Sequence, residues 1–173
     1  MASLSRLARD AVRRSAESSG VAPPAFLKDE NGAPLPTNGV FWSLTHKSEW
    51  VGGVVAACPV GIDIEKIRPR SDALFRKIAN DRERRQFQGF EDIDLAFHCC
   101  WTAKEAVLKA AGVGLTRLSA CRIVSVNREL DAVVGFGGRE WRVAHYRFGD
   151  HLAASVASDT SIKWAWIAAG AFD

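Results

Sequence analysis

The segment Gly61-Ile62-Asp63-Ile64-Glu65 carries the first side chains with clear chemical potential. Residues alternate between the two faces of a strand, so the isoleucines can enter a core while Asp63 and Glu65 project together from the other face. Neighbouring carboxylates repel each other, and they usually lie exposed at a strand end or share a cation. The exposed strand end is the simpler explanation. If the two carboxylates instead share a cation, Mg²⁺ is the natural one, because it prefers oxygen ligands.

A second group of charges follows in Trp101-Thr102-Ala103-Lys104-Glu105-Ala106-Val107-Leu108-Lys109. Glu105 and Lys109 lie four residues apart, in the order that favours an exposed ion pair on a helix worth about 0.2–0.5 kcal/mol. Such a pair accounts for both residues without any function. It does not explain Lys104, a further charge directly before Glu105.

The third element is Ser43-Leu44-Thr45-His46. Ser43 and Thr45 point to one side of a predicted strand, and His46 lies at its end. Taken alone, a histidine in this place is more often a hydrogen-bonded residue at a strand end than a catalytic one.

In this order the three segments resemble the 4′-phosphopantetheinyl transferase family. They are similar to its larger, monomeric, pseudo-dimeric class, which activates peptide and polyketide synthases. In the smaller, trimeric class the acidic segment opens the chain and the histidine segment comes late. The resemblance covers residues 40–157, including Gly112-x-Gly114-Leu115 and the run Leu152-Ala153-Ala154-Ser155-Val156.

Members of this family move the 4′-phosphopantetheine arm of coenzyme A to a serine of an acyl or peptidyl carrier protein and release 3′,5′-ADP. The resemblance implies that Asp63, Glu65 and Glu105 hold Mg²⁺ against the pyrophosphate of coenzyme A. It also implies that Glu105 takes the proton of the serine, directly or through a metal-bound water. Glu105 and Lys109 are therefore the expected catalytic residues.

The same resemblance implies the residues that bind the co-substrate. Lys109 is expected to contact a phosphate or the pantetheine arm of coenzyme A, and Ser43, Thr45 and His46 are expected to lie at its phosphates. The family often has a G-K-P segment before these residues. Here Ala33 takes the place of that lysine, in Gly32-Ala33-Pro34.

The implied fold is α+β, with two related halves about a pseudo-twofold axis and the active site between them. The first half, residues 1–59, is expected to be shortened and to hold a helix, a loop and the S-L-T-H strand. Residues 60–173 are expected to carry the metal site. The expectation of a shortened first half comes from the 42 residues that precede Ser43, about half as many as is usual in the family.

Local patterns predict the elements that position these segments. Apolar residues at helical spacing predict an amphipathic helix that begins near Leu4 and ends at 18–20. A helical segment over 71–112 is interrupted near 80–81 and 89–92. The order of strands, helices and strands favours α+β over regular βαβ alternation. The predicted strands cover residues 40–46, 51–57, 60–65, 121–126, 141–148, 152–156 and 162–168.

Composition limits the class of protein. The 173 residues are 47% hydrophobic and 25% charged, with a formal net charge of +3. This predicts a packed domain and excludes a disordered chain. The apolar stretches are shorter than the ~20 residues of a membrane span, so no membrane association is expected. The four cysteines form no C-x-x-C pair, which indicates a reducing, cytoplasmic compartment.

A carrier protein is the expected macromolecular partner of a monomer. Residues 65–85 contain eight Lys or Arg against four Asp or Glu, and carrier proteins are typically acidic. A solvated pair of helices without a partner is the alternative. A non-catalytic homologue that binds coenzyme A or a carrier protein is the alternative function. Nucleic acid is not expected, because Trp42, Trp50 and Trp141 are not interleaved with basic residues.

Overall fold

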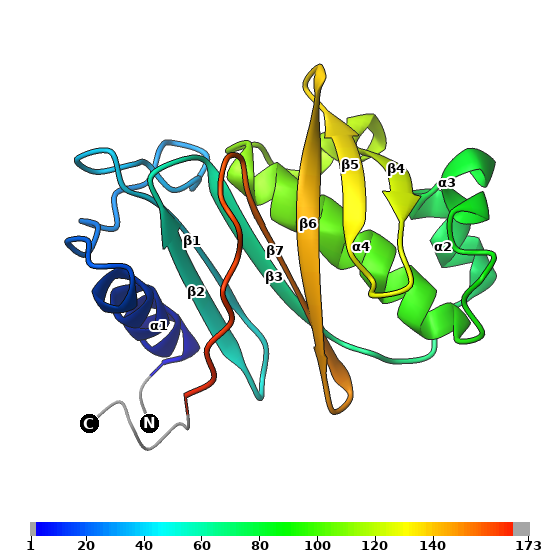
Figure 1. Cartoon of the computed structure of the whole chain (residues 1–173), viewed down its shortest axis with the longest axis horizontal. Coiled ribbons are helices and arrows are strands. Elements are labelled where there is room, and N and C mark those ends of the chain that lie inside the picture. The colour runs from blue at the N-terminus through cyan, green and yellow to red at the C-terminus, as the bar shows by residue number, and fades with distance from the viewer. Residues whose placement is uncertain (1–2, 168–173) are drawn as a thin grey trace.

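Two sheets lie side by side in the computed structural model, and each carries one long helix (Figure 1). The structure describes residues 3–167. The mixed α+β fold expected from the sequence is confirmed. In chain order the elements are α1 (Leu4–Ser18), β1 (Phe41–His46), β2 (Val51–Ala56), β3 (Val60–Lys66), α2 (Asp72–Ile78), α3 (Asp81–Arg85), α4 (Ile93–Ala110), the 3₁₀-helix η1 (Leu115–Ala120), β4 (Arg122–Val126), β5 (Ala132–Phe136), β6 (Arg139–Phe148) and β7 (His151–Ala157).

The smaller sheet is the antiparallel hairpin of β1 and β2, with α1 packed on it. α1 begins after Ser3, whose hydroxyl accepts a hydrogen bond from the backbone N–H of Arg6. Its buried stripe consists of Ala8, Val12 and Ala16. Helix and hairpin approach so closely that a Cβ on Gly53 would lie 2.3 Å from the backbone nitrogen of Val12.

The larger sheet has five antiparallel strands in the order β3-β7-β6-β5-β4, and α4 lies along one of its faces (Figure 1). The main hydrophobic core fills the space between this face and α4. At the edge strand β3 the approach is closest. A Cβ on Gly61 would lie 1.9 Å from the carbonyl oxygen of Ala106. This contact brings the second half of α4 directly onto β3.

The sheets are joined where β1 lies beside β3. The hydroxyl of Ser43 accepts a hydrogen bond from the backbone N–H of Ile62 at 3.2 Å. The side chains of Ile62 and Ile64 are buried and reach Gly52 of β2. The expectation that these isoleucines enter a core is therefore confirmed, and their neighbours Asp63 and Glu65 face α4.

The predicted elements up to α4 correspond to those of the structure. The interruptions expected in the helical segment coincide with Asn80, which caps α3, and Asp92, which caps α4. The chain passes from the smaller to the larger sheet between β2 and β3. The pseudo-twofold axis, and with it the division into residues 1–59 and 60–173, stays a prediction.

One strand, β5, is not found by the sequence analysis. It spans only five residues, and its alternation is weak because a glycine replaces one side chain. The signal that marks it is the turn that follows. Gly137 and Gly138 have φ of 63° and 77°, which is the backbone of a two-residue hairpin loop to β6.

The strand predicted over 162–168 is wrong. Residues 162–167 form no strand, and residue 168 lies outside the described residues. This segment is held by aromatic side chains instead of by a ladder of backbone hydrogen bonds. The ring of Trp166 packs 4.4 Å from that of Phe148 and 6.0 Å from that of Trp50. Aromatic residues raise strand propensity, but here their rings supply the contact.

The cysteines behave as the sequence predicts. All four are free, and Cys99, Cys100 and Cys121 are buried as small apolar side chains. Of the helices between residues 3 and 167, none has the length and apolar character that crossing a membrane requires.

Gly61→Ala is expected to lower the free energy of unfolding by about 1–3 kcal/mol, because the added methyl group has no space between β3 and α4. Gly135→Ala is the matched control, since its methyl group would find ordinary contact at 3.5 Å. Urea denaturation measures both variants. Equal stability of the two would contradict the close approach of α4 to β3.

Candidate functional site

The three carboxylates singled out in the sequence flank the contact between β3 and α4. Asp63 and Glu65 extend from β3 toward the helix, and Glu105 and Lys109 extend from the helix toward the strand. The Nζ atom of Lys109 lies 2.7 Å from Oδ1 of Asp63 and 3.7 Å from Oε2 of Glu105. Lys109 also donates to the carbonyl oxygen of Ile62 at 3.0 Å. The lysine therefore lies between the two elements and binds both.

Asp63 is the most buried member of this group, with 2% of its surface exposed. Its Oδ1 atom accepts hydrogen bonds from Lys109 and, at 3.1 Å, from the hydroxyl of Thr45. Its Oδ2 atom is buried and has no hydrogen-bond partner among residues 3–167. Burial raises the pKa of Asp63, although the charge of Lys109 acts in the opposite direction. The exposed strand end considered for this residue is thus excluded.

Glu65 binds a lysine that the sequence analysis did not assign to it. Its Oε1 atom lies 2.7 Å from Nζ of Lys47 and accepts a hydrogen bond from the indole N–H of Trp101 at 3.2 Å. Burial lowers the pKa of Lys47, but the hydrogen bond and charge of Glu65 and the charges of the other carboxylates outweigh this and raise it. The sequence feature that could have indicated this role for Lys47 is its position directly after the S-L-T-H strand.

Glu105 is mostly buried, and its alternative role in an exposed ion pair does not hold. It is 3.7 Å from Lys109, whose closer partner is Asp63. Burial, followed by the charge of Asp63, raises the pKa of Glu105. A carboxylate with a raised pKa is a stronger base than an ordinary one.

The S-L-T-H strand contributes in two different ways. The hydroxyls of Ser43 and Thr45 are buried and turned toward β3, where they bind the backbone of Ile62 and the carboxylate of Asp63. His46 is exposed at the end of β1. Only the histidine therefore has its side chain open to solvent.

The donor chemistry of this cluster fits an oxygen-preferring divalent cation. Asp63, Glu65 and Glu105 offer carboxylate oxygens from two elements, although these oxygens do not all lie within 4.8 Å of one another. One of them, Oδ2 of Asp63, is buried without a hydrogen-bond partner in the described part of the chain. The two lysines neutralise part of the charge. The three carboxylates and two lysines together keep a net negative charge, which suits a cation.

A second acidic group lies at the ends of two hairpins. Glu49, Asp150 and His151 are the one set, within residues 3–167, whose potential ligand atoms all lie within 4.8 Å of one another. Lys66 already binds two of them, at 2.8 Å from Glu49 and 3.1 Å from Asp150. These salt bridges account for the group as a contact between the hairpins.

Lys104 lies outside the site. Its side chain is fully buried, and its Nζ atom lies 2.6 Å from Oε1 of Glu83 and 2.6 Å from the carbonyl oxygen of Ile78. It therefore holds α2 and α3 against α4. Its role, which the sequence left unexplained, is therefore structural.

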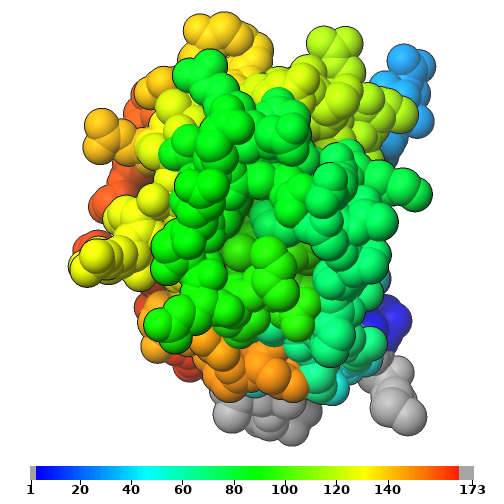
Figure 2. Space-filling model, turned by 90° about the vertical axis from the view of Figure 1, so that its right-hand side faces the viewer, coloured from blue at the N-terminus to red at the C-terminus, as the bar shows by residue number. Residues whose placement is uncertain are grey.

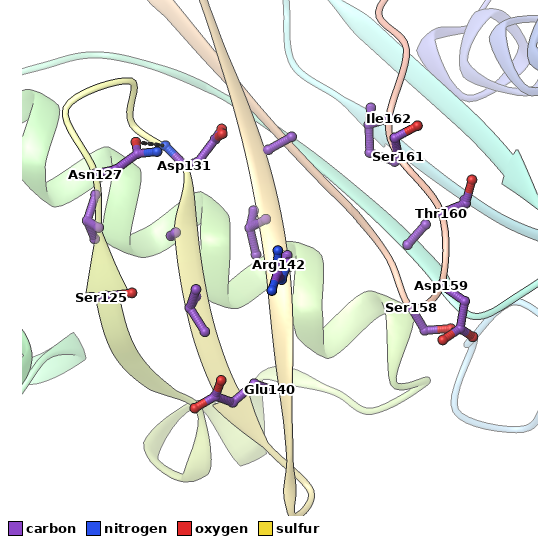
Figure 3. Close-up of a pocket in the computed structure, with 16 residues that line it drawn as sticks. Ser125, Asn127, Asp131, Glu140, Arg142, Ser158, Asp159, Thr160, Ser161 and Ile162 are labelled. Atoms are coloured by element: carbon purple, nitrogen blue, oxygen red, sulfur yellow. Dashed lines mark hydrogen bonds between the residues drawn. The ribbon is translucent and has the colours of Figure 1, made fainter.

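A cavity of about 890 Å³ lies away from the carboxylates, between the outer face of β5 and β6 and the segment over residues 157–162 (Figure 3). Arg142 and Glu140 project into it from β6, and Asp159 and Thr160 from the opposite side. None of the site residues predicted from the sequence lines it.

Comparison with known proteins identifies the relatives of this chain. A family model described as the 4′-phosphopantetheinyl transferase superfamily matches residues 59–161. The chain is 33% identical over 95 residues to the 4′-phosphopantetheinyl transferase psf-1 of Bacillus pumilus, covering 53% of this chain and 41% of that protein. It is 30% identical over 92 residues to the 4′-phosphopantetheinyl transferase gsp of Aneurinibacillus migulanus, covering 52% and 39%. The alignments thus span about two fifths of each relative.

Lys109→Met is expected to lower the free energy of unfolding by roughly 2–4 kcal/mol, because it leaves the Asp63 carboxylate buried without its cation. Asp63→Asn removes that charge, so the double variant should recover most of the loss. Chemical denaturation of the four proteins gives the coupling free energy between the two side chains. A coupling near zero would show that the pair is as weak as one on the surface.

Proposed function

The chain belongs to the 4′-phosphopantetheinyl transferase superfamily, and we propose that it transfers the 4′-phosphopantetheine group of coenzyme A to a serine of an acyl or peptidyl carrier protein. The reaction depends on Mg²⁺ and releases 3′,5′-ADP. One observation carries the proposal. The acidic motif of β3 and the K-E-A-x-x-K motif of α4 are joined by the ion pair of Lys109 with Asp63, whose second oxygen is buried without a hydrogen-bond partner among the described residues.

Asp63, Glu65 and Glu105 are the residues proposed to hold Mg²⁺. The bound ion supplies positive charge to the diphosphate of coenzyme A as negative charge develops on the leaving group. Asp63 offers its unpaired Oδ2 atom for this purpose and keeps Oδ1 on Lys109 and Thr45.

Glu105 is proposed to accept the proton of the serine hydroxyl. The serine oxygen forms a bond to the phosphorus next to the pantetheine arm, the bond from that phosphorus to the bridging oxygen breaks, and 3′,5′-ADP leaves. Glu105 lies 3.7 Å from Lys109 in the same cluster, and it can act as a base where the ion leaves one of its carboxylate oxygens free.

Lys109 and His46 are proposed to contact the phosphates of coenzyme A. Lys109 is anchored on Asp63 and the backbone of β3, so its ammonium group is already oriented at the carboxylate cluster. His46 is the exposed member of its segment. Ser43 and Thr45 support the coenzyme site by holding β1 against β3 and orienting Asp63.

The end of the molecule formed by α2, α3 and the loop that leads from β3 into α2 is the proposed carrier-protein surface (Figure 2). Five exposed cations in this region have no salt bridge within the described part of the chain. An acidic carrier protein would be attracted to this positive charge, which raises the rate of encounter. The five residues are Arg68, Arg70, Lys77, Arg82 and Arg85. The protein is further proposed to act as a monomer in the cytoplasm, where its free cysteines stay reduced.

Intact-mass spectrometry tests the proposed reaction. Incubation of an apo carrier protein with this protein, coenzyme A and Mg²⁺ is expected to add one phosphopantetheine group, and EDTA should abolish the gain. Asp63→Ala should lower the rate by at least ~100-fold, since it removes a ligand of the ion. Glu49→Gln is the matched control. It removes a carboxylate from the second acidic group and should leave the rate unchanged.

Full activity of the Asp63→Ala variant would contradict the assignment of the metal ligands. No mass gain with several carrier proteins, while coenzyme A still binds, would favour a non-catalytic homologue.

A further inference from the structure

Lys47 lies in the carboxylate cluster but belongs to none of the three motifs. Its backbone N–H donates to the carbonyl oxygen of Trp50 at 2.8 Å and closes the turn between β1 and β2. From this turn its side chain reaches across to β3, where Nζ lies 2.7 Å from Oε1 of Glu65. The lysine is thus anchored on the smaller sheet and bound to a carboxylate of the larger one.

The contact uses an oxygen that is already engaged. Oε1 of Glu65 also accepts the indole N–H of Trp101 at 3.2 Å. A carboxylate oxygen has two lone-pair directions, so these two donors fill them. A cation can coordinate this oxygen only if a donor leaves, and at the other oxygen, Oε2, it would still be repelled by the ammonium group of Lys47 on the same carboxylate. Lys47 is the donor that would leave, because its positive charge is repelled by the incoming ion and Trp101 is neutral.

The two lysines of the cluster differ in how firmly they are held. Lys109 lies 2.7 Å from Oδ1 of Asp63 and 3.7 Å from Oε2 of Glu105. Lys109 is also held by the carbonyl oxygen of Ile62. The side chain of Lys47 is 38% exposed and has Glu65 as its one salt-bridge partner in the described part of the chain. An incoming cation would therefore repel Lys47, and the partly exposed side chain has space to move away from Glu65.

We propose that Lys47 competes with the divalent cation for Glu65, and that its displacement sets how tightly the ion binds. This inference rests on the metal site of the proposed function and adds a residue that the motifs do not contain. Lys47 touches a metal ligand and acts through it, so it is a positioning residue.

Titration with Mn²⁺, followed by the electron paramagnetic resonance signal of the free ion, tests the competition without any turnover. Lys47→Met keeps most of the side-chain volume and removes the charge. It is expected to lower the dissociation constant of Mn²⁺ by about five- to tenfold, the effect of removing one close competing cation. Lys66→Met is the matched control. Lys66 follows Glu65 in β3, and its own partners are Glu49 and Asp150. Removing its charge should change the dissociation constant of Mn²⁺ by less than about twofold.

Each remaining outcome overturns a defined part of the account. Equal affinity of the wild type and Lys47→Met, with binding lost in Asp63→Asn, would overturn the inference and leave the metal site intact. Weaker binding by Lys47→Met, with the native circular dichroism spectrum retained, would overturn it as well. Binding by neither protein would overturn both the inference and the metal assignment.

Discussion

A carboxylate buried between two sheets and a helix places the strongest demand on this structure. Asp63 is 2% exposed, and a buried charge costs free energy unless a cation and hydrogen bonds compensate for it. The compensation comes from two directions. Lys109 of α4 supplies the charge and Thr45 of β1 supplies a hydrogen bond. Both require that α4 and β1 lie close to β3, and the missing side chain of Gly61 permits this on the helix side.

The sequence predicts the local relations within this site but not the contacts between its elements. The alternation of the β3 segment placed its two carboxylates on one face, and the helical spacing placed Glu105 and Lys109 together. These are local relations, which a periodic pattern defines. The partner of each side chain is not local. Lys109 binds Asp63 more closely than Glu105, although Glu105 is the neighbour that helical spacing indicates. Only the approach of α4 to β3 decides between them.

The fold shows a similar limit. The elements up to α4 followed from their patterns, because their apolar residues repeat with a clear period. The period of β5 is too weak for prediction, because the strand has five residues and one is glycine. The strand predicted over residues 162–168 is not formed by residues 162–167, which are rich in aromatic residues. Those aromatic rings pack on β6 and on the first hairpin instead. Side-chain packing between distant segments overrode local propensity in this case.

The lysines give the site its chemical character. A cluster of three carboxylates alone would repel itself, and Lys47 and Lys109 reduce that repulsion while leaving a net negative charge. One lysine is held at three points and the other at one. The proposed exchange of an internal cation for a metal ion would therefore break the single side-chain contact of Lys47 and leave Lys109 in place. Lys104 and Glu83, buried behind it, keep α2 and α3 in place against the same helix.

The central claim is that Asp63, Glu65 and Glu105 form a divalent metal site. Anomalous diffraction from crystals grown with Mn²⁺ and coenzyme A tests it most directly. The account predicts a strong anomalous peak bounded by these three carboxylates, with the diphosphate beside it and Lys47 turned away from Glu65. A peak at Glu49, Asp150 and His151 alone, or no peak near Asp63 while coenzyme A is bound, would contradict the account.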